Sequence, residues 1–131
     1  VSSIFTQIIN RKIPAHIVHE NDFCIAFMDI MPIKKGHVLV VPKLEVDYIF
    51  DLPLDVYQEL FHFARQVSNS IKKVFKCNRV GLSIIGFEVP HCHIHLVPMN
   101  KIEDMNFNLK HATTNSELVK VANEISLNIN I

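Results

Sequence analysis

The chain has no tryptophan, few glycines and no excess of charge of either sign. It contains 3 glycines, and its 13 lysines and arginines balance 13 aspartates and glutamates. A balanced chain offers no general basic surface for nucleic acid and no acidic, disordered tail. Its apolar runs stay well short of the ~20 residues that span a membrane, and its N-terminal residues lack the charged and then apolar pattern of a signal peptide. We therefore expect neither a nucleic-acid nor a membrane partner.

Cysteine is scarce as well. Cys24, Cys77 and Cys92 are scattered and form no C-x-x-C pair, which indicates reduced thiols and a cytoplasmic location. We interpret Cys92 as a small buried apolar residue rather than a reactive thiol. A length of 131 residues with 49% hydrophobic content suits one domain, 1–131, with a real core.

What the sequence does contain is a set of apolar patterns typical of short strands and amphipathic helices. They predict helices at 4–10, 54–76 and 115–126, strands at 17–19, 24–28, 37–41, 80–85 and 91–99, and a loop at 106–113. Strands outnumber helices, and several neighbours are joined by short connections. The expected fold class is therefore α+β, a mostly antiparallel sheet with helices packed on one face.

The long helix predicted at 54–76 has an apolar face at three- and four-residue spacing. The members of this face are Val56, Leu60, Phe63, Ala64, Val67, Ile71, Val74 and Phe75. Tyr57 and Phe61 lie beside this face and widen it. Either a self-complementary dimer interface or a broad intramolecular contact would use the extra width, and the sequence leaves both open.

Three histidines, His91, His93 and His95, alternate with apolar residues. Successive side chains of a strand point to opposite faces, so this pattern places three imidazoles on one face and turns the residues between them into a core. Imidazole can act as nucleophile, base or acid near neutral pH, and as a neutral ring it attacks phosphorus. A metal site, with Glu88 the one nearby acidic ligand, and exposed histidines without a role are the alternatives; we favour catalysis.

The segment His91–Val97 resembles the histidine triad motif, His-φ-His-φ-His-φ-φ with φ apolar. Ser3–Ala15 resembles the same family's N-terminal helix and Ile-Pro-Ala exit, and Ala26–Pro32 resembles its nucleoside-binding segment. Gly36–Lys43 resembles its Gly-His strand. The resemblance to the histidine triad (HIT) family, in its bacterial nucleotide-hydrolase-like (Hint-like) branch, covers about residues 3–100 and little of the tail at 101–131.

The resemblance implies a five-stranded sheet carrying the long and the short N-terminal helix, and a two-fold homodimer. It also implies a hydrolase or transferase that cleaves at the α-phosphorus of a purine nucleoside 5′-phosphate derivative. Phosphoramidates and dinucleoside polyphosphates are the substrates it suggests, with no cofactor. By this resemblance His93 attacks and carries a nucleotidyl group, His91 and His95 flank it, and His37 reaches the same site.

The same resemblance implies a nucleoside pocket near the N-terminus. Asp29 would accept hydrogen bonds from the ribose hydroxyls, or it would instead cap the loop at Met31 and Pro32. The residues implied around base and sugar are Phe5, Ile4, Ile8, Phe27, Met28 and Ile30.

The chain departs from the family pattern just before the triad, where a loop is shortened. Ile84 stands where many relatives have an asparagine, and Phe87 and Glu88 stand where a glutamine and a hydroxyl residue are usual. That hydroxyl contacts the phosphate, and a carboxylate in its place repels a phosphate unless it is turned away, protonated or paired. A nucleotide-binding sensor with little or no catalysis is therefore the alternative function.

A second departure concerns a structural zinc that some bacterial relatives hold. Its ligand positions fall here on Ser3, Thr6 and Glu45, together with the first triad histidine. Because thiolates are missing, we expect no structural zinc and no other bound metal.

Overall fold

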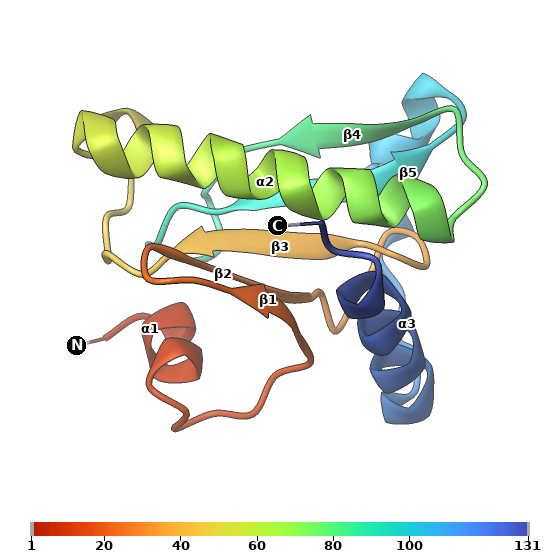
Figure 1. Ribbon diagram of the computed structural model, residues 1–131, viewed down its shortest axis with the longest axis horizontal. Helices are drawn as coiled ribbons and strands as arrows, with labels where there is room; N and C mark the ends of the chain where they lie inside the picture. The colour runs from red at the N-terminus through yellow and green to blue at the C-terminus, as the bar shows by residue number, and fades with distance from the viewer. Residues whose placement is uncertain (1, 131) are drawn as a thin grey trace.

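The computed structural model describes residues 2–130 as a five-stranded sheet with helices on both faces (Figure 1). The helices are α1 (Ile4–Ile9), α2 (Leu54–Val74) and α3 (Asn115–Leu127), with single 3-10 turns η1 (Ile49–Asp51), η2 (Ile102–Met105) and η3 (Phe107–Leu109). The strands are β1 (Ile17–Glu20), β2 (Cys24–Met28), β3 (Val38–Pro42), β4 (Arg79–Ser83) and β5 (Ile94–Met99). Each predicted helix and strand is present, whereas the predicted loop at 106–113 includes η3.

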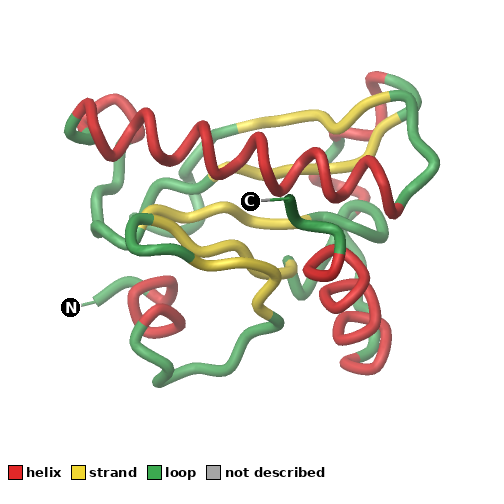
Figure 2. The backbone as a smooth tube through the Cα atoms, in the orientation of Figure 1, coloured by secondary structure: helices red, strands yellow, loops and turns green. Residues whose placement is uncertain are grey.

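The strands follow the order β1-β2-β3-β5-β4, and in the described part of the chain every pairing is antiparallel. The predicted α+β class with a mostly antiparallel sheet is confirmed. The strands β1 and β4 form the two edges. The sheet is therefore an open one, and Figure 2 shows its five strands in yellow between the red helices.

The alternation of side chains along the strands divides the core into two. Ala26 and Met28 face α2 and α3, and together with Cys92, Ile94 and other apolar residues they form the larger cluster. The intervening residues Ile25, Phe27, Leu39 and Val41 face α1. Together with Phe5 and Ile8 of that helix they form a smaller cluster. The expectation that all helices lie on one face is therefore wrong for α1, and in Figure 1 the strands β1 to β3 lie between α1 and α2.

The buried face of α2 is the one that the spacing predicts. Its fully covered side chains include Leu60, Phe63, Val67 and Ile71. Tyr57 and Phe61 pack partly against the same core, with ring centroids 5.0 Å apart. The packing of α2 inside the protein thus uses part of the widened apolar face of this helix.

The strand β5 begins at Ile94, three residues later than predicted. Pro42, opposite this stretch, has no N–H to offer a ladder, and its carbonyl accepts a hydrogen bond from the His91 ring. The N–H of Cys92 donates to the carbonyl of Val46 instead of to the sheet. His91 and His93 therefore lie in an irregular segment, not on the strand. Cys92 still packs in the core as predicted, and burial raises the pKa of its thiol to about 11.

The segment between β5 and α3 folds back over the end of the sheet. The carboxylate of Asp104 accepts hydrogen bonds from the N–H groups of Asn100 and Lys101 and pairs with Lys34 at 3.0 Å. The N–H of His111 donates to the carbonyl of Pro32. These contacts fix the segment that carries η2 and η3 against the loop between β2 and β3. Of the described helices, none has the length and apolar character to cross a membrane.

Candidate active site

A cavity of about 520 Å³ lies between α1, β2 and the histidine segment. All of the residues implied for the nucleoside pocket line it, namely Ile4, Phe5, Ile8, Phe27, Met28, Asp29 and Ile30. Glu88, at the position compared with the phosphate-contacting hydroxyl, lines it as well. His93 and His95 line it too. Its wall is mostly apolar with a few convergent polar groups, which is the usual composition of a small-molecule site.

His93 is held in one tautomer by the backbone. Its Nδ1 lies 2.8 Å from the carbonyl oxygen of His91, and because a carbonyl only accepts, Nδ1 carries the proton. The Nε2 atom of the neutral ring is therefore unprotonated. Burial lowers the pKa of His93 below its usual value, so the ring is neutral at pH 7. The rings of Phe5 and His93 pack in a T-shaped arrangement, with centroids 4.9 Å apart. His93 thus presents a free lone pair in a ring that lines the cavity.

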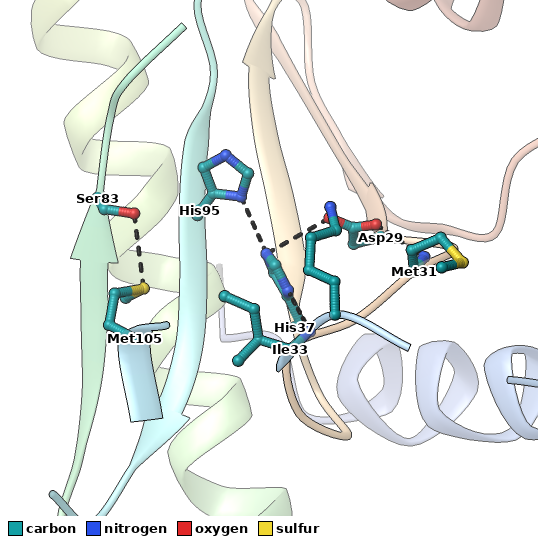
Figure 3. A network of polar contacts seen from close by, with 8 residues as sticks. Asp29, Met31, Ile33, His37, Ser83, His95 and Met105 are labelled. Atoms are coloured by element: carbon teal, nitrogen blue, oxygen red, sulfur yellow. Dashed lines mark hydrogen bonds and ion pairs between the residues drawn. The ribbon is translucent and has the colours of Figure 1, made fainter. Parts of the chain in front are cut away.

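A second chain of hydrogen bonds fixes the tautomer of His95 (Figure 3). The N–H of Ile33 donates to Nδ1 of His37 at 3.0 Å, so His37 carries its proton on Nε2. That Nε2 donates to Nδ1 of His95, also at 3.0 Å. His95 must then hold its own proton on Nε2, from which it can donate to a bound oxygen. Figure 3 shows His37 between His95 and Asp29.

Both rings of this chain are neutral. Burial lowers the pKa of His37 to about 4 and that of His95 to about 3. The contact of 3.6 Å between His37 Nε2 and Asp29 Oδ2 is therefore dipolar at neutral pH rather than an ion pair. His37 lies behind His95 and does not line the cavity. Its position is that of a residue that orients His95.

His91 lies apart from the cavity that its two neighbours line. Its fully buried ring donates from Nε2 to the carbonyl of Pro42 at 2.8 Å and accepts at Nδ1 from the hydroxyl of Ser3 at 2.7 Å. The structure thus brings His93, His95 and His37 together, and it uses His91 to anchor the segment through its ring and its carbonyl. The face of three aligned imidazoles that the alternation predicts is not formed.

The positions compared with zinc ligands do meet in space. Ser3 and Thr6 lie at the start of α1, and Glu45 accepts from the N–H of Ser3 at 2.7 Å and from the hydroxyl of Thr6 at 2.6 Å. The hydroxyl of Ser3 links this group to His91. Hydroxyls and one carboxylate make a weaker donor set for zinc than thiolates, and here they satisfy one another. The absence of a structural zinc stays a prediction.

Besides its contact with His37, the carboxylate of Asp29 has two hydrogen-bond donors. Its Oδ1 accepts from the N–H of Met31 at 2.9 Å, so the alternative role as a cap of this loop is confirmed. Its Oδ2 accepts from Nζ of Lys110 at 2.8 Å. Lys110 lines the cavity and was missed by the sequence analysis, because it lies in the tail outside the family resemblance.

The sequence analysis also missed Phe107. Its ring meets His95 edge to face, with centroids 4.8 Å apart at 83°. A single aromatic residue between polar neighbours is the one sequence signal that could have indicated it. Besides Lys110, the residues of the 520 Å³ cavity that were not expected are Ile13, Pro14, Ala15, Met31, Leu39 and Val89.

One group of described side chains has donor atoms close enough to hold a metal ion. Atoms of Asp29, His37 and His95 all lie within 4.8 Å of one another. Lys110 already neutralises the carboxylate, and the two rings already share a proton between their nitrogens. The arrangement is therefore complete as a hydrogen-bonded network, and the catalytic interpretation of these residues does not require a metal.

Comparisons with known proteins agree with this geometry. The family model of the HIT domain matches residues 10–102. An uncharacterized HIT-like protein of Methanocaldococcus jannaschii is 38% identical over 102 residues, which are 72% of this chain and 77% of that protein. A solved structure of a HIT-like protein from Bartonella henselae superposes with a TM-score of 0.86 at 26% identity, covering 98% of this chain and 96% of that one.

Two yeast relatives have names that state an activity. A bis(5′-nucleosyl)-tetraphosphatase of Schizosaccharomyces pombe is 32% identical over 104 residues, 74% of this chain and 57% of that protein. An adenosine 5′-monophosphoramidase of Saccharomyces cerevisiae is 30% identical over 96 residues, 72% of this chain and 61% of that protein. The chain thus spans less than two thirds of either enzyme.

Proposed function

The chain belongs to the HIT family, and on this premise we propose that it is a nucleotide hydrolase or transferase. It cleaves at the α-phosphorus of a purine nucleoside 5′-phosphate derivative and passes through a nucleotidyl group on His93. The observation that carries the proposal is the bond from His93 Nδ1 to the carbonyl of His91, which leaves Nε2 unprotonated in a ring that lines the nucleoside cavity. The two yeast relatives, a polyphosphatase and a phosphoramidase by name, support the same reaction class.

In the first step, the lone pair of His93 Nε2 forms a bond to the α-phosphorus. The bond from phosphorus to the leaving group breaks, its electron pair stays on the leaving group, and that group takes a proton from water. In the second step, water attacks the phosphorus, the N–P bond breaks, and the electron pair returns to Nε2 while a proton is released. The ring is positively charged between the steps, and the His91 carbonyl at Nδ1 stabilises that charge.

Two further residues assist in this proposal. The proton on Nε2 of His95 donates to a phosphoryl oxygen, and the alignment of that proton comes from His37. Asp29 binds the ribose hydroxyls through Oδ2, the oxygen that accepts from Lys110 in this structure. When the nucleotide binds, ribose either displaces Lys110 from this oxygen or binds the carboxylate beside it. The apolar wall around Phe5 and Phe27 takes the base.

Adenosine 5′-phosphoramidate tests the proposal, with released AMP as the readout and no metal added. The wild-type protein should release AMP, and His93→Ala should lose at least about a thousandfold in kcat, because a covalent step through the nucleophile is removed. The control is His62→Ala, an exposed histidine of α2, which should keep wild-type turnover. Intact-protein mass spectrometry after rapid quenching should show a nucleotidyl adduct that His93→Ala lacks. Equal turnover by wild type and His93→Ala would reject His93 as the nucleophile.

The alternative, a nucleotide sensor without efficient catalysis, has one specific observation in its favour. Lys110 occupies the ribose-binding oxygen of Asp29, and Glu88 lines the cavity where a phosphate must approach. Calorimetry separates the two functions: a sensor binds AMP tightly while phosphoramidate hydrolysis stays at the background rate.

A further inference from the structure

His93 and His95 form a wall that two cavities share. One is the nucleoside cavity, and the second, of about 210 Å³, is lined by these two rings and by Ile85, Gly86, Phe87, Glu88 and Phe107. A substrate whose phosphorus reaches His93 therefore has one space for its nucleoside and another for the group that leaves.

Apart from the two histidines, the lining of the second cavity is apolar except at Glu88. Ile85 and Phe87 stand at 51% and 94% exposure, and Phe107 closes on the His95 ring. Among residues 2–130, no lysine or arginine lines it, and Glu88 is its one charged side chain. Lys110, whose charge acts to lower the pKa of His93 and His95, lines the nucleoside cavity and is bonded to Asp29.

This lining discriminates by charge. A phosphate chain leaving from the α-phosphorus carries two or more negative charges, and here it would meet a carboxylate and apolar side chains instead of cationic donors. An amine leaving group becomes protonated and positively charged at neutral pH. Its hydrocarbon part can pack against the aromatic and aliphatic side chains of the cavity. Glu88 also acts on His93 itself, since its negative charge works to raise the pKa of that ring against the larger effect of burial. A carboxylate at this place favours the positive charge that forms on His93 during the reaction.

We propose that the second cavity is the leaving-group subsite, and that Glu88 and Phe107 select amines with an apolar or cationic body over anionic leaving groups. Among nucleoside phosphoramidates, those whose amine carries a negative charge are thus the poorest substrates. This inference rests on the proposed hydrolysis at His93. In the step concerned, the P–N bond breaks, its electron pair stays on the amine nitrogen, and that nitrogen takes a proton from water.

The test uses adenosine phosphoramidates that differ only in the amine. The amines are phenethylamine, 1,4-diaminobutane and 4-aminobutyrate, and unsubstituted adenosine 5′-phosphoramidate serves as the reference because it places nothing in the second cavity. For the wild-type protein, kcat/KM for the apolar and the cationic compounds should exceed that for the anionic compound by about tenfold or more. Diadenosine tetraphosphate should be at least as poor as the anionic compound.

Three variants locate the preference. Glu88→Gln should raise kcat/KM for the anionic compound relative to the cationic one by about tenfold, and Glu88→Lys should reverse their order. Phe107→Leu should lower kcat/KM for the phenethyl compound relative to the reference by several-fold. The control is Glu103→Gln, an exposed carboxylate outside both cavities, which should keep the wild-type order.

The outcomes separate the two proposals. If the wild-type protein and Glu88→Gln hydrolyse all compounds with the same relative kcat/KM, the subsite assignment is wrong while the proposed function stands. If diadenosine tetraphosphate is the better substrate, the subsite assignment is also wrong. If no compound is hydrolysed, the reference included, the proposed function fails and the subsite with it.

Discussion

At the scale of single residues, the site is organised by the protonation of its histidines. Each of His91, His93, His95 and His37 has one ring nitrogen whose partner fixes where the proton sits. None of them is an exposed imidazole free to change its charge. In the proposed reaction, the unprotonated nitrogen of His93 is the nucleophile and the protonated nitrogen of His95 is the donor.

Burial of neutral histidines makes the stability of the protein depend on pH. In the unfolded chain histidine has a pKa of about 6.5, whereas in the fold burial lowers it to about 4 for His37 and about 3 for His95. Between these values the unfolded chain binds protons that the folded chain does not. The free energy of unfolding should therefore fall as the pH is lowered from about 6.5 to about 4, by on the order of 1–2 kcal/mol for each ring at about pH 5.

Urea unfolding at several pH values measures this dependence. His37→Asn should give a shallower fall of the unfolding free energy with decreasing pH, and the exposed His62→Ala should keep the wild-type slope. A wild-type stability that stays level between about pH 6.5 and 4 would contradict neutral burial of these rings.

At the scale of elements, the short helix α1 links the nucleoside pocket to the triad. Its N-cap Ser3 accepts from the N–H of Thr6 and donates to the ring of His91. The same helix places Phe5 against the His93 ring. A helix of six residues is too short to be stable alone, so its position depends on these contacts and on the smaller core cluster.

Ser3→Ala should therefore affect both stability and chemistry. Loss of the cap and of the donor to a buried ring should lower the free energy of unfolding by about 1–2 kcal/mol. Because the His91 carbonyl that holds His93 loses its anchor, kcat for adenosine 5′-phosphoramidate should fall more than KM changes. Ser3→Thr, which keeps the hydroxyl, should restore kcat.

The matched control is Thr114→Ala, which removes the N-cap of α3 at a residue that does not line either cavity that His93 and His95 line. It should cost similar stability with kcat unchanged. If both variants lower kcat equally, Ser3 is only a structural cap and not a positioning residue.

At the scale of the whole molecule, the open sheet leaves β4 as an edge with less burial than the strands beside it. Leu82 on this edge is 46% exposed. We propose, as the family resemblance implies, that two copies form a two-fold homodimer along β4 and the exposed flank of α2. That residues 1–131 are one domain and that the protein is cytoplasmic also stay predictions.

Light scattering coupled to gel filtration tests the dimer. The wild-type protein should elute with twice the mass of one chain, and Leu82→Asp should shift it to the monomer mass, because a charge would be buried in the contact. Leu127→Asp, at the exposed end of α3, should remain a dimer. A wild-type monomer at micromolar concentration would overturn the proposed assembly.

The sequence by itself determined the α-helices and strands, the apolar face of α2, and about half of the residues that line the larger cavity. These features follow from the periodicity of apolar residues and from short motifs, and both are patterns among residues close to one another in the sequence. It did not determine which side of the sheet α1 covers, where β5 begins, or which triad histidine serves as an anchor.

Those features were decided by contacts between distant positions. Ser3 meets His91 across 88 positions, and Lys110 meets Asp29 across 81. The pairing of β3 with β5 ends at Val40 and Ile94, and beyond it the carbonyl of Pro42 accepts a hydrogen bond from the His91 ring. A hydrogen bond depends on where the folded chain brings two atoms, and no periodicity in the sequence records that. The tertiary structure alone therefore assigned the protons of the histidines and brought Phe107 and Lys110 into the site.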